Sequence, residues 1–266
     1  MLRDKNPGIT IGLKCDGLDV KNLCSRAIFQ RLFVSFPAQK IGFVDGCRPF
    51  IGIDGCFLKG PYGGQLLVAV ALDANFGIFL LAIMFAEVES EDSWGYFFTI
   101  FNQHIGDGRH LTFMSDKKKG ILKALKNIHP EDSSRYCARH RYINFRKLYP
   151  GPKLKGLYWD AVRATNEIDF KHAMDFIKSV NEDAWKWLLQ DEPKHWSLHA
   201  FDHHVKVDHV TNNMTESFNA WLEKSRQLPV LTLLEYIRRK VMKRIHGRFE
   251  KGNAWESEIP PMMTES

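Results

Sequence analysis

The stretch PFIGIDGCFLKGPYGGQLLVAVALDANFGIFLLAIMFAEV, residues 49–88, holds three apolar runs separated by short glycine-rich or polar turns. Glycine pairs such as Gly63-Gly64 mark tight turns because they tolerate unusual backbone angles, and clusters of Asp, Asn and Gly do the same. Short connections join antiparallel neighbours in a sheet. The stretch therefore predicts an antiparallel meander of three strands, which cover residues 49–58, 65–72 and 78–88.

The segments that follow alternate between helical and extended patterns. A helix is predicted after the start signal at residues 90–93, and a strand at 110–115. The inward face of this helix is formed by Trp94, Phe97, Phe98, Phe101 and Ile105. A short basic helix at 117–128 and a strand at 134–139 come next. Three antiparallel strands, a helix, a strand, a helix and a strand are typical of an α/β, ribonuclease H-like mixed sheet, in which the first and fourth strands are neighbours.

The rest of the chain is arranged around this core. Residues 23–36 have apolar groups at helix-like spacing and are predicted to be a leading helix or strand. A helical period begins near Tyr142, which indicates an all-helical insertion before the chain returns to the sheet. The predicted organisation is a lead-in segment at 1–48, the first part of the core at 49–141, the helical insertion at 142–210, the return to the core with a basic C-terminal helix at 211–252, and a loose tail at 253–266.

Composition narrows the class of protein. The 266 residues are 44% hydrophobic, which is ample for a folded core, and the formal net charge of +6 favours an anionic partner. Five scattered cysteines in a chain of this size are expected to be reduced thiols of an intracellular protein. No apolar stretch reaches the roughly 18–20 residues that span a bilayer, and the start of the chain lacks the apolar core of a signal peptide. We therefore expect no membrane partner.

Three acidic residues are candidates for catalysis: Asp54, Asp116 and Glu216. Each aspartate closes an apolar run, so each is expected at the end of a buried strand, and the glutamate opens a helical segment. Three carboxylates delivered in this way can hold two Mg²⁺ or Mn²⁺ ions roughly 3.5–4 Å apart, the arrangement that supports in-line attack on phosphodiesters.

Each of the three also has a plain structural interpretation. An aspartate before glycine, as at Asp54, is commonly a turn residue, and Asp116 before Lys117 has the pattern of a helix N-cap. A glutamate such as Glu216 is most often a solvated helix residue. For each position we favour the catalytic interpretation, in part because of the resemblance described below.

Two further groups of residues flank the candidate site. Cys137 and His140 have the spacing of half a zinc site, but two ligands do not close one, so we favour packing or DNA contact over zinc. Basic residues gather beside the acidic positions and on the last helix. Such residues either form a solvated face or bind the phosphates of DNA. We favour phosphate binding for those beside the acidic positions and leave both interpretations open for those on the last helix. The DNA-binding candidates are Lys117, Lys118, Lys119, Arg139, Arg141, Arg146, Arg238 and Arg239.

These blocks resemble a known group, the plant Mutator-like element (MULE) transposases. The resemblance rests on NPG at 6–8, GCRPFIGIDGCFLKGPYGGQLLVAVALDAN at 46–75, SDKKKG at 115–120, RYCARHRYINFRK at 135–147 and NNMTESFNAWL at 212–222. It implies a ribonuclease H-like catalytic core with a helical insertion. It also implies that Asp54, Asp116 and Glu216 are the Asp-Asp-Glu triad, and that Cys137 and His140 are the family's Cys-x-x-His motif.

The resemblance leads to a functional hypothesis with one main rival. We expect a DNA transposase catalytic domain that cleaves and joins double-stranded DNA in the nucleus, using two divalent metal ions. Larger relatives often carry an N-terminal DNA-binding region and a C-terminal SWIM zinc finger. We expect neither in this sequence, and for the zinc finger the reason is that no cysteine follows Cys137. The rival is therefore a domesticated, transposase-derived DNA-binding or regulatory protein without catalytic activity. A general ribonuclease H-like nuclease is a weaker third reading. Transposases generally act as multimers, so a homo-oligomer is also considered, although the sequence shows no coiled coil or interface motif.

Overall fold

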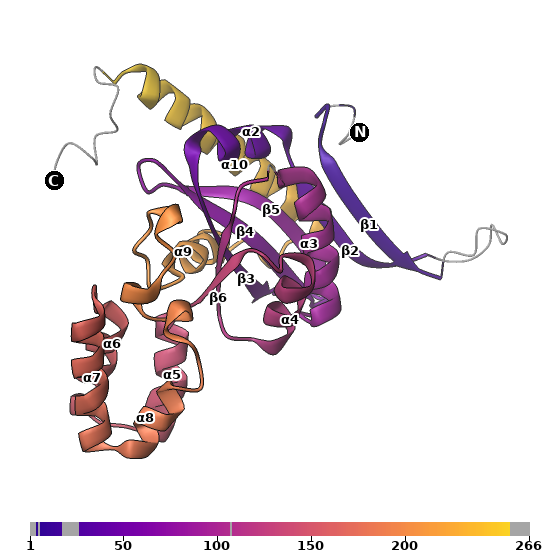
Figure 1. Ribbon diagram of the computed structural model, residues 1–266. Coiled ribbons are helices and arrows are strands. Elements are labelled where there is room, and N and C mark those ends of the chain that lie inside the picture. The colour runs from indigo at the N-terminus through magenta and orange to yellow at the C-terminus, as the bar shows by residue number, and fades with distance from the viewer. Residues whose placement is uncertain (1–3, 5, 18–26, 107, 256–266) are drawn as a thin grey trace.

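The computed structural model describes residues 4, 6–17, 27–106 and 108–255. Its centre is a mixed sheet of seven strands among these residues, in the order β1-β2-β5-β4-β3-β6-β7 (Figure 1). The strands are β1 Thr10–Asp16, β2 Ile28–Ser35, β3 Cys47–Phe57, β4 Gln65–Asp73, β5 Ile78–Ala86, β6 Thr112–Ser115 and β7 Ser133–Tyr136. The sheet with its helices confirms the α/β class.

The predicted meander and the predicted neighbours are both confirmed. Strands β3, β4 and β5 pair antiparallel in sequence order. Strand β6 then pairs parallel with β3, with Gly52 opposite Met114, and β7 pairs parallel with β6. A parallel connection needs a crossover, which is supplied by helix α3 Glu91–Ile105 before β6 and by helix α4 Lys119–Ile128 before β7.

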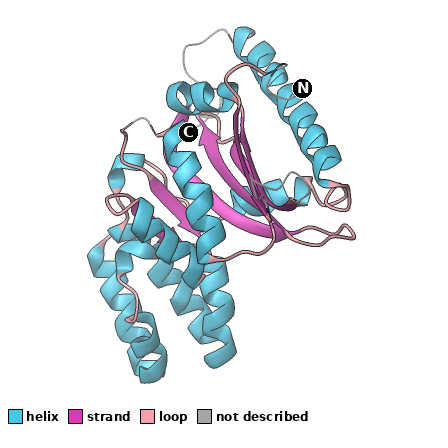
Figure 2. Ribbon diagram, turned by 90° about the vertical axis from the view of Figure 1, so that its right-hand side faces the viewer, coloured by secondary structure: helices cyan, strands magenta, loops and turns pink. Residues whose placement is uncertain are grey.

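Both faces of the sheet are buried by helices, as Figure 2 shows from the side. On one face, Leu67 and Ala69 of β4 pack in the cluster that holds the aromatic side of α3, as predicted. On the other face, Leu66 and Val68 pack in the cluster formed with helices α9 Asn213–Trp221 and α10 Val230–Asn253. Because side chains alternate along a strand, a strand covered on both faces is expected to be apolar on both sides, and β4 is apolar from Leu66 to Leu72.

The N-terminal part confirms one predicted element and contains two that were not predicted. Residues 28–35 of the expected leading element form strand β2, residues 23–26 of it lie outside the described part of the chain, and β1 and helix α2 Pro37–Gly46 were not predicted. Strand β1 pairs with β2 along its whole length, whereas β2 meets β5 through three residue pairs. The alternation of apolar residues in these two strands is too short to predict a strand from the local sequence. Their structure is determined by pairing with neighbouring strands.

The helical insertion is present as helices α5 Ala138–Leu148, α6 Pro152–Arg163, α7 Glu167–Val180 and α8 Glu182–Leu188, followed by three 3₁₀ turns, η1 Pro193–His195, η2 Leu198–Ala200 and η3 His203–Val205. These helices project from one end of the sheet (Figure 1). They have their own core around Phe145, Tyr158, Ile177 and Trp196. The strand expected at 134–139 ends at Tyr136, and Ala138 already begins α5, so that part of the prediction was wrong.

Three further predictions concern the cysteines, the C-terminal tail and membrane-spanning segments. The described cysteines, Cys15, Cys47, Cys56 and Cys137, are free thiols, as expected. Cys24 and most of the expected loose tail lie outside the described residues. None of the described helices combines the length and the apolar character that a membrane crossing needs.

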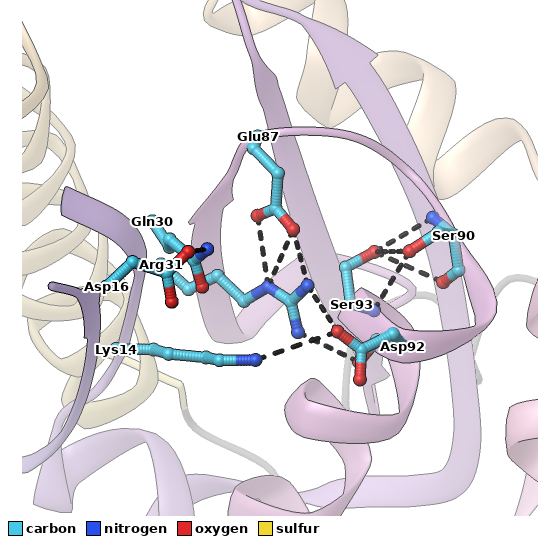
Figure 3. A network of polar contacts seen from close by, with 8 residues as sticks. All are labelled: Lys14, Asp16, Gln30, Arg31, Glu87, Ser90, Asp92 and Ser93. Carbon is cyan, nitrogen blue, oxygen red and sulfur yellow. Dashed lines mark hydrogen bonds and ion pairs between the residues drawn. The ribbon is translucent and has the colours of Figure 1, made fainter. Parts of the chain in front are cut away.

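Arg31 of β2 ties the N-terminal hairpin to the loop that enters α3 (Figure 3). Its side chain is 3% exposed. Its guanidinium donates to both carboxylate oxygens of Glu87, to Asp92 Oδ2 at 2.6 Å and to the Asp92 carbonyl at 3.0 Å. These two carboxylates hold the pKa of Arg31 above its ordinary value. The loop is closed by a capping box in which Ser90 and Ser93 bond each other's backbone.

We predict that Arg31→Ala lowers the free energy of unfolding by about 2–3 kcal/mol, because buried donors and their charged partners lose their hydrogen bonds. The matched control is Arg239→Ala, whose exposed guanidinium pairs with Glu235 on α10. An exposed pair of this kind contributes roughly 0–1 kcal/mol. Urea unfolding of both variants measures the difference, and equal effects would show that the Arg31 network does not anchor the hairpin.

Candidate active site

Helix α9 lies directly against strand β3, and a glycine allows this approach. A Cβ added at Gly52 would lie 2.5 Å from Met214 Cε and 2.6 Å from Asn212 Oδ1, closer than side chains approach. Asn212 is buried, and its Nδ2 donates to the Ile53 carbonyl at 3.0 Å. The start of α9 is therefore fixed to the strand at Gly52 and Ile53, directly before Asp54, and this contact brings Glu216 of α9 to the same end of the sheet.

Asp54 lies within β3 and not at its end, which corrects the expected position. The strand continues to Phe57, and Asp54 pairs with Val68 of β4. However, the register with β6 reaches only Gly52, so no strand pairs with β3 beside Asp54 on that side. Its Oδ1 accepts from the Gly55 backbone at 2.9 Å and its Oδ2 from Asn219 Nδ2 at 3.0 Å. The interpretation of Asp54 as a turn residue is wrong.

Asp116 follows the last residue of β6, as predicted. It is not an N-cap, because Lys118 occupies that position of α4 and no side chain caps the helix. Its Oδ2 pairs with Lys118 Nζ at 3.2 Å, whereas its Oδ1 is buried and has no hydrogen-bond partner. A buried carboxylate oxygen without a donor is costly, and a bound cation would satisfy it.

Glu89 is a fourth carboxylate at this place, and the sequence reading missed it. It precedes the N-cap of α3, and its side chain is 10% exposed. Trp94 Nε1 donates to its Oε1 at 3.2 Å, and Lys118 Nζ lies 2.7 Å from its Oε2. A Cβ added at Gly55 would lie 2.9 Å from the Glu89 carboxylate, so that glycine leaves room for it. The sequence position of Glu89 just before a helix did not mark it as a site residue, because acidic residues are common at helix N-termini.

Burial and neighbouring charge raise the pKa of Asp54 to about 6. Burial has the larger effect, since it disfavours the charged form, and the negative charges of Asp116 and Glu89 add to it. The ammonium of Lys118 and the backbone N–H of Gly55 act in the opposite direction. Lys118 thus lies among three carboxylates, Asp54, Glu89 and Asp116, and compensates part of their repulsion.

Glu216 lies in the first turn of α9 and has different neighbours. Its Oε2 accepts from an Arg139 guanidinium nitrogen at 2.7 Å. Its carboxylate also lies near Cys137 and His140, with ligand atoms of all three within 4.8 Å of one another. In the described part of the chain this is the one group of three or more potential metal ligands that lie so close together. Asp54 and Asp116 are not members of it.

Cys137 and His140 influence each other strongly. Cys137 is the N-cap residue of α5, and its Sγ accepts from the Asn212 backbone N–H at 3.3 Å. The adjacent thiol raises the pKa of His140 to about 9, helped by the charges of Asp116 and Glu216. Burial raises the pKa of the Cys137 thiol, but hydrogen bonds from the imidazole and backbone of His140 and from the backbone of Asn212 together outweigh it, so the net shift is downward. Asp116 and Glu216 both act on His140, and Asn219 of the helix that carries Glu216 bonds Asp54, so the two parts of the site are close.

The predicted DNA-binding residues have different surroundings. Arg141 is buried, bonds Asp191 and the Leu188 carbonyl, and lies over two tryptophan rings, so it stabilises the insertion and is not placed to contact DNA. Arg146 is exposed, and the side chain of Lys119 is not among those described. The other five have acidic partners: Lys117 with Asp191, Lys118 with Glu89 and Asp116, Arg139 with Glu216, and Arg238 and Arg239 with Glu235.

With this geometry in hand, residues 50–144 match the family model of the MULE transposase domain. The matched stretch is 95 of the 266 residues, and over this stretch the chain is similar to that domain. The matched region holds Asp54, Glu89, Asp116, Cys137 and His140, whereas Glu216 lies beyond it. No curated protein matches the chain.

We predict that Asp54→Asn stabilises the protein at pH 7 in the absence of divalent ions. The folded-state pKa is about 6, and the unfolded-state pKa is about 3.9. Between these values the folded state holds a proton that the unfolded state has lost, so this group lowers stability as pH rises through the interval, and the loss persists above it. Asparagine cannot ionise, so the variant should gain about 2–3 kcal/mol at pH 7 and nothing near pH 3.

Thermal unfolding at several pH values in chelator measures this difference. Asp175→Asn, at an exposed position of α7, controls for the substitution itself. A difference between Asp54→Asn and wild type that does not change from pH 3 to pH 7 would contradict the raised pKa.

Proposed function

We propose that this chain is the catalytic domain of a DNA transposase of the MULE family, built on a ribonuclease H-like core and using Asp54, Asp116 and Glu216. The observation that carries the proposal is that acidic residues of three separate elements, β3, the end of β6 and α9, lie near one another: Asp116 acts on Asp54, Asn219 of α9 bonds Asp54, and Asp116 and Glu216 both act on His140. The strand order β5-β4-β3-β6-β7 supports the ribonuclease H-like assignment.

The residues of this end fit hard divalent cations. Asp116 offers a buried carboxylate oxygen without a donor, and Asp54 and Glu89 add oxygen ligands beside it. Bound Mg²⁺ or Mn²⁺ ions would activate the attacking water or 3′-hydroxyl and stabilise the leaving oxygen. Asp54, Asp116 and Glu216 would hold them. Asn219 lies on the helix that carries Glu216, and its hydrogen bond to Asp54 would orient the Asp54 carboxylate.

Basic side chains around this end would position the DNA. Lys117, Lys118 and Arg139 are exposed or half-exposed and lie beside the acidic residues, so their cationic groups can contact phosphates. Their present carboxylate partners, Glu89, Asp116, Asp191 and Glu216, hold them in place without DNA. A double-stranded DNA substrate would place the protein in the nucleus.

Nicking of supercoiled plasmid tests the proposed chemistry. With Mn²⁺ or Mg²⁺, we expect the wild type to nick and Asp116→Asn and Glu216→Gln to lose at least 100-fold in rate, because each removes a ligand of the reacting centre. Equal nicking by all three would identify a contaminating nuclease and refute the site. Binding of DNA without nicking by any of them would favour the domesticated binding protein. Cleavage of an RNA–DNA hybrid in preference to plasmid would favour a general nuclease.

Lys118 gives a second prediction, on metal affinity. Its ammonium neutralises Glu89 and Asp116, so a divalent cation must compete with it for the same oxygens. Lys118→Met should therefore tighten Mn²⁺ binding by about tenfold, or about 1.4 kcal/mol. Calorimetric titration measures it without any DNA. The matched control is Lys123→Met, one turn along α4, whose partner Glu91 lies outside the group. Unchanged or weaker affinity in Lys118→Met would contradict the competition.

A further inference from the structure

The geometry points to a second metal site, for a zinc-type transition-metal ion, formed by Cys137, His140 and Glu216. Ligand atoms of these three side chains lie within 4.8 Å of one another. Cys137 and His140 come from the start of α5, and Glu216 comes from the first turn of α9. The pair Cys137 and His140 alone does not close a zinc site, and the fold supplies the third ligand from a distant part of the sequence.

The donor set selects the class of ion. A sulfur, an imidazole nitrogen and a carboxylate oxygen are typical zinc ligands, whereas Mg²⁺ prefers oxygen alone. Three protein ligands with one open position make a tetrahedral zinc site of the kind that also binds water or substrate. At bond lengths of roughly 2.0–2.3 Å the ligand atoms lie roughly 3.5 Å apart, so these side chains need to close by about 1 Å.

The surroundings of the three residues are suited to an ion. His140 Nδ1 is buried and has no hydrogen-bond partner, so a ligand atom is on offer. The Sγ of Cys137, a residue that is 1% exposed, accepts the Asn212 backbone N–H, a contact that orients a ligating sulfur. The Glu216 side chain is 30% exposed and forms the open side. Arg139 now occupies one oxygen of Glu216 with its guanidinium, and a bound cation would take over this neutralisation.

Zinc binding at this site would affect the proposed reaction. This effect rests on the proposed function, whereas the metal site itself does not. Glu216 belongs both to the proposed catalytic triad and to the zinc site. A carboxylate held by zinc beside Cys137 and His140 is withdrawn from Asp54 and Asp116. Zinc is therefore expected to inhibit the magnesium-dependent reaction.

Titration with Co²⁺, which takes zinc sites and has visible spectra, tests the proposal on the apo-protein. We expect tetrahedral absorption bands and a near-ultraviolet sulfur-to-cobalt band in the wild type, both displaced by Zn²⁺ and not by excess Mg²⁺. Cys137→Ser should lose the sulfur band. Cys56→Ser, which removes a buried thiol on β3, is the matched control and should keep it. Glu216→Gln and His140→Ala should each weaken cobalt binding at least tenfold.

The outcomes are decisive in both directions. Absence of a sulfur-to-cobalt band in the wild type, or its survival in Cys137→Ser, would overturn the site. If Cys137→Ser does not fold, Glu216→Gln replaces it, because this part-exposed position tolerates an amide; undiminished cobalt binding by that variant overturns the site equally. Since cobalt binding requires neither DNA nor cleavage, failure of the nicking assay leaves this test intact, and failure of this test leaves the nicking assay intact.

Discussion

Helix α9 and strand β3 approach so closely at Gly52 that no side chain fits between them, and the rest of the site depends on this contact. A methyl group at Gly52 would meet Asn212 and Met214, and it would displace the helix that carries Glu216. Asn212 completes the contact by donating to the Ile53 carbonyl and to the sulfur of Cys137. One buried asparagine therefore connects the strand of Asp54, the helix of Glu216 and the start of α5.

Charge balance offsets the repulsion among the acidic residues at this end of the sheet. Asp54, Glu89 and Asp116 repel one another in a partly buried place, and Lys118 is the cation that lies among them. Arg139 has the corresponding role for Glu216. These ion pairs offset the repulsion between carboxylates but add little to the stability of the fold, because the cost of desolvating the charges cancels most of their attraction. The raised pKa of Asp54 is the residual cost, and such costs are common at functional sites.

The sequence predicted the centre of the fold well, because strands β3 to β6 have unambiguous turns and apolar runs. It also placed Asp116 at a strand end and Glu216 at a helix start. The sequence prediction failed where tertiary contacts determine the structure. Strand β1 is a partly exposed edge strand, and Asp54 lies inside its strand. Arg141 belongs to a basic stretch typical of DNA contacts, but its side chain is buried beside Asp191. Glu89 was missed, since nothing local distinguishes a carboxylate facing the site from one facing solvent. Lys118 was predicted to bind DNA phosphates, and its pairing with Glu89 and Asp116 could not be foreseen from the sequence.

The insertion is joined to the site and not merely attached to the sheet. It leaves the core at Cys137 and returns at Asn212, and these two points are bonded to each other; beside them Ala138 N donates to the Val210 carbonyl. Tyr158 of α6 fixes the same start by donating to the Ala138 carbonyl at 2.8 Å. The Cys-x-x-His block and the Asn-Asn-x-x-Glu block are thus one structural unit, although a whole helical segment separates them. A change in the packing of that segment is expected to move Cys137, His140 and Glu216 together.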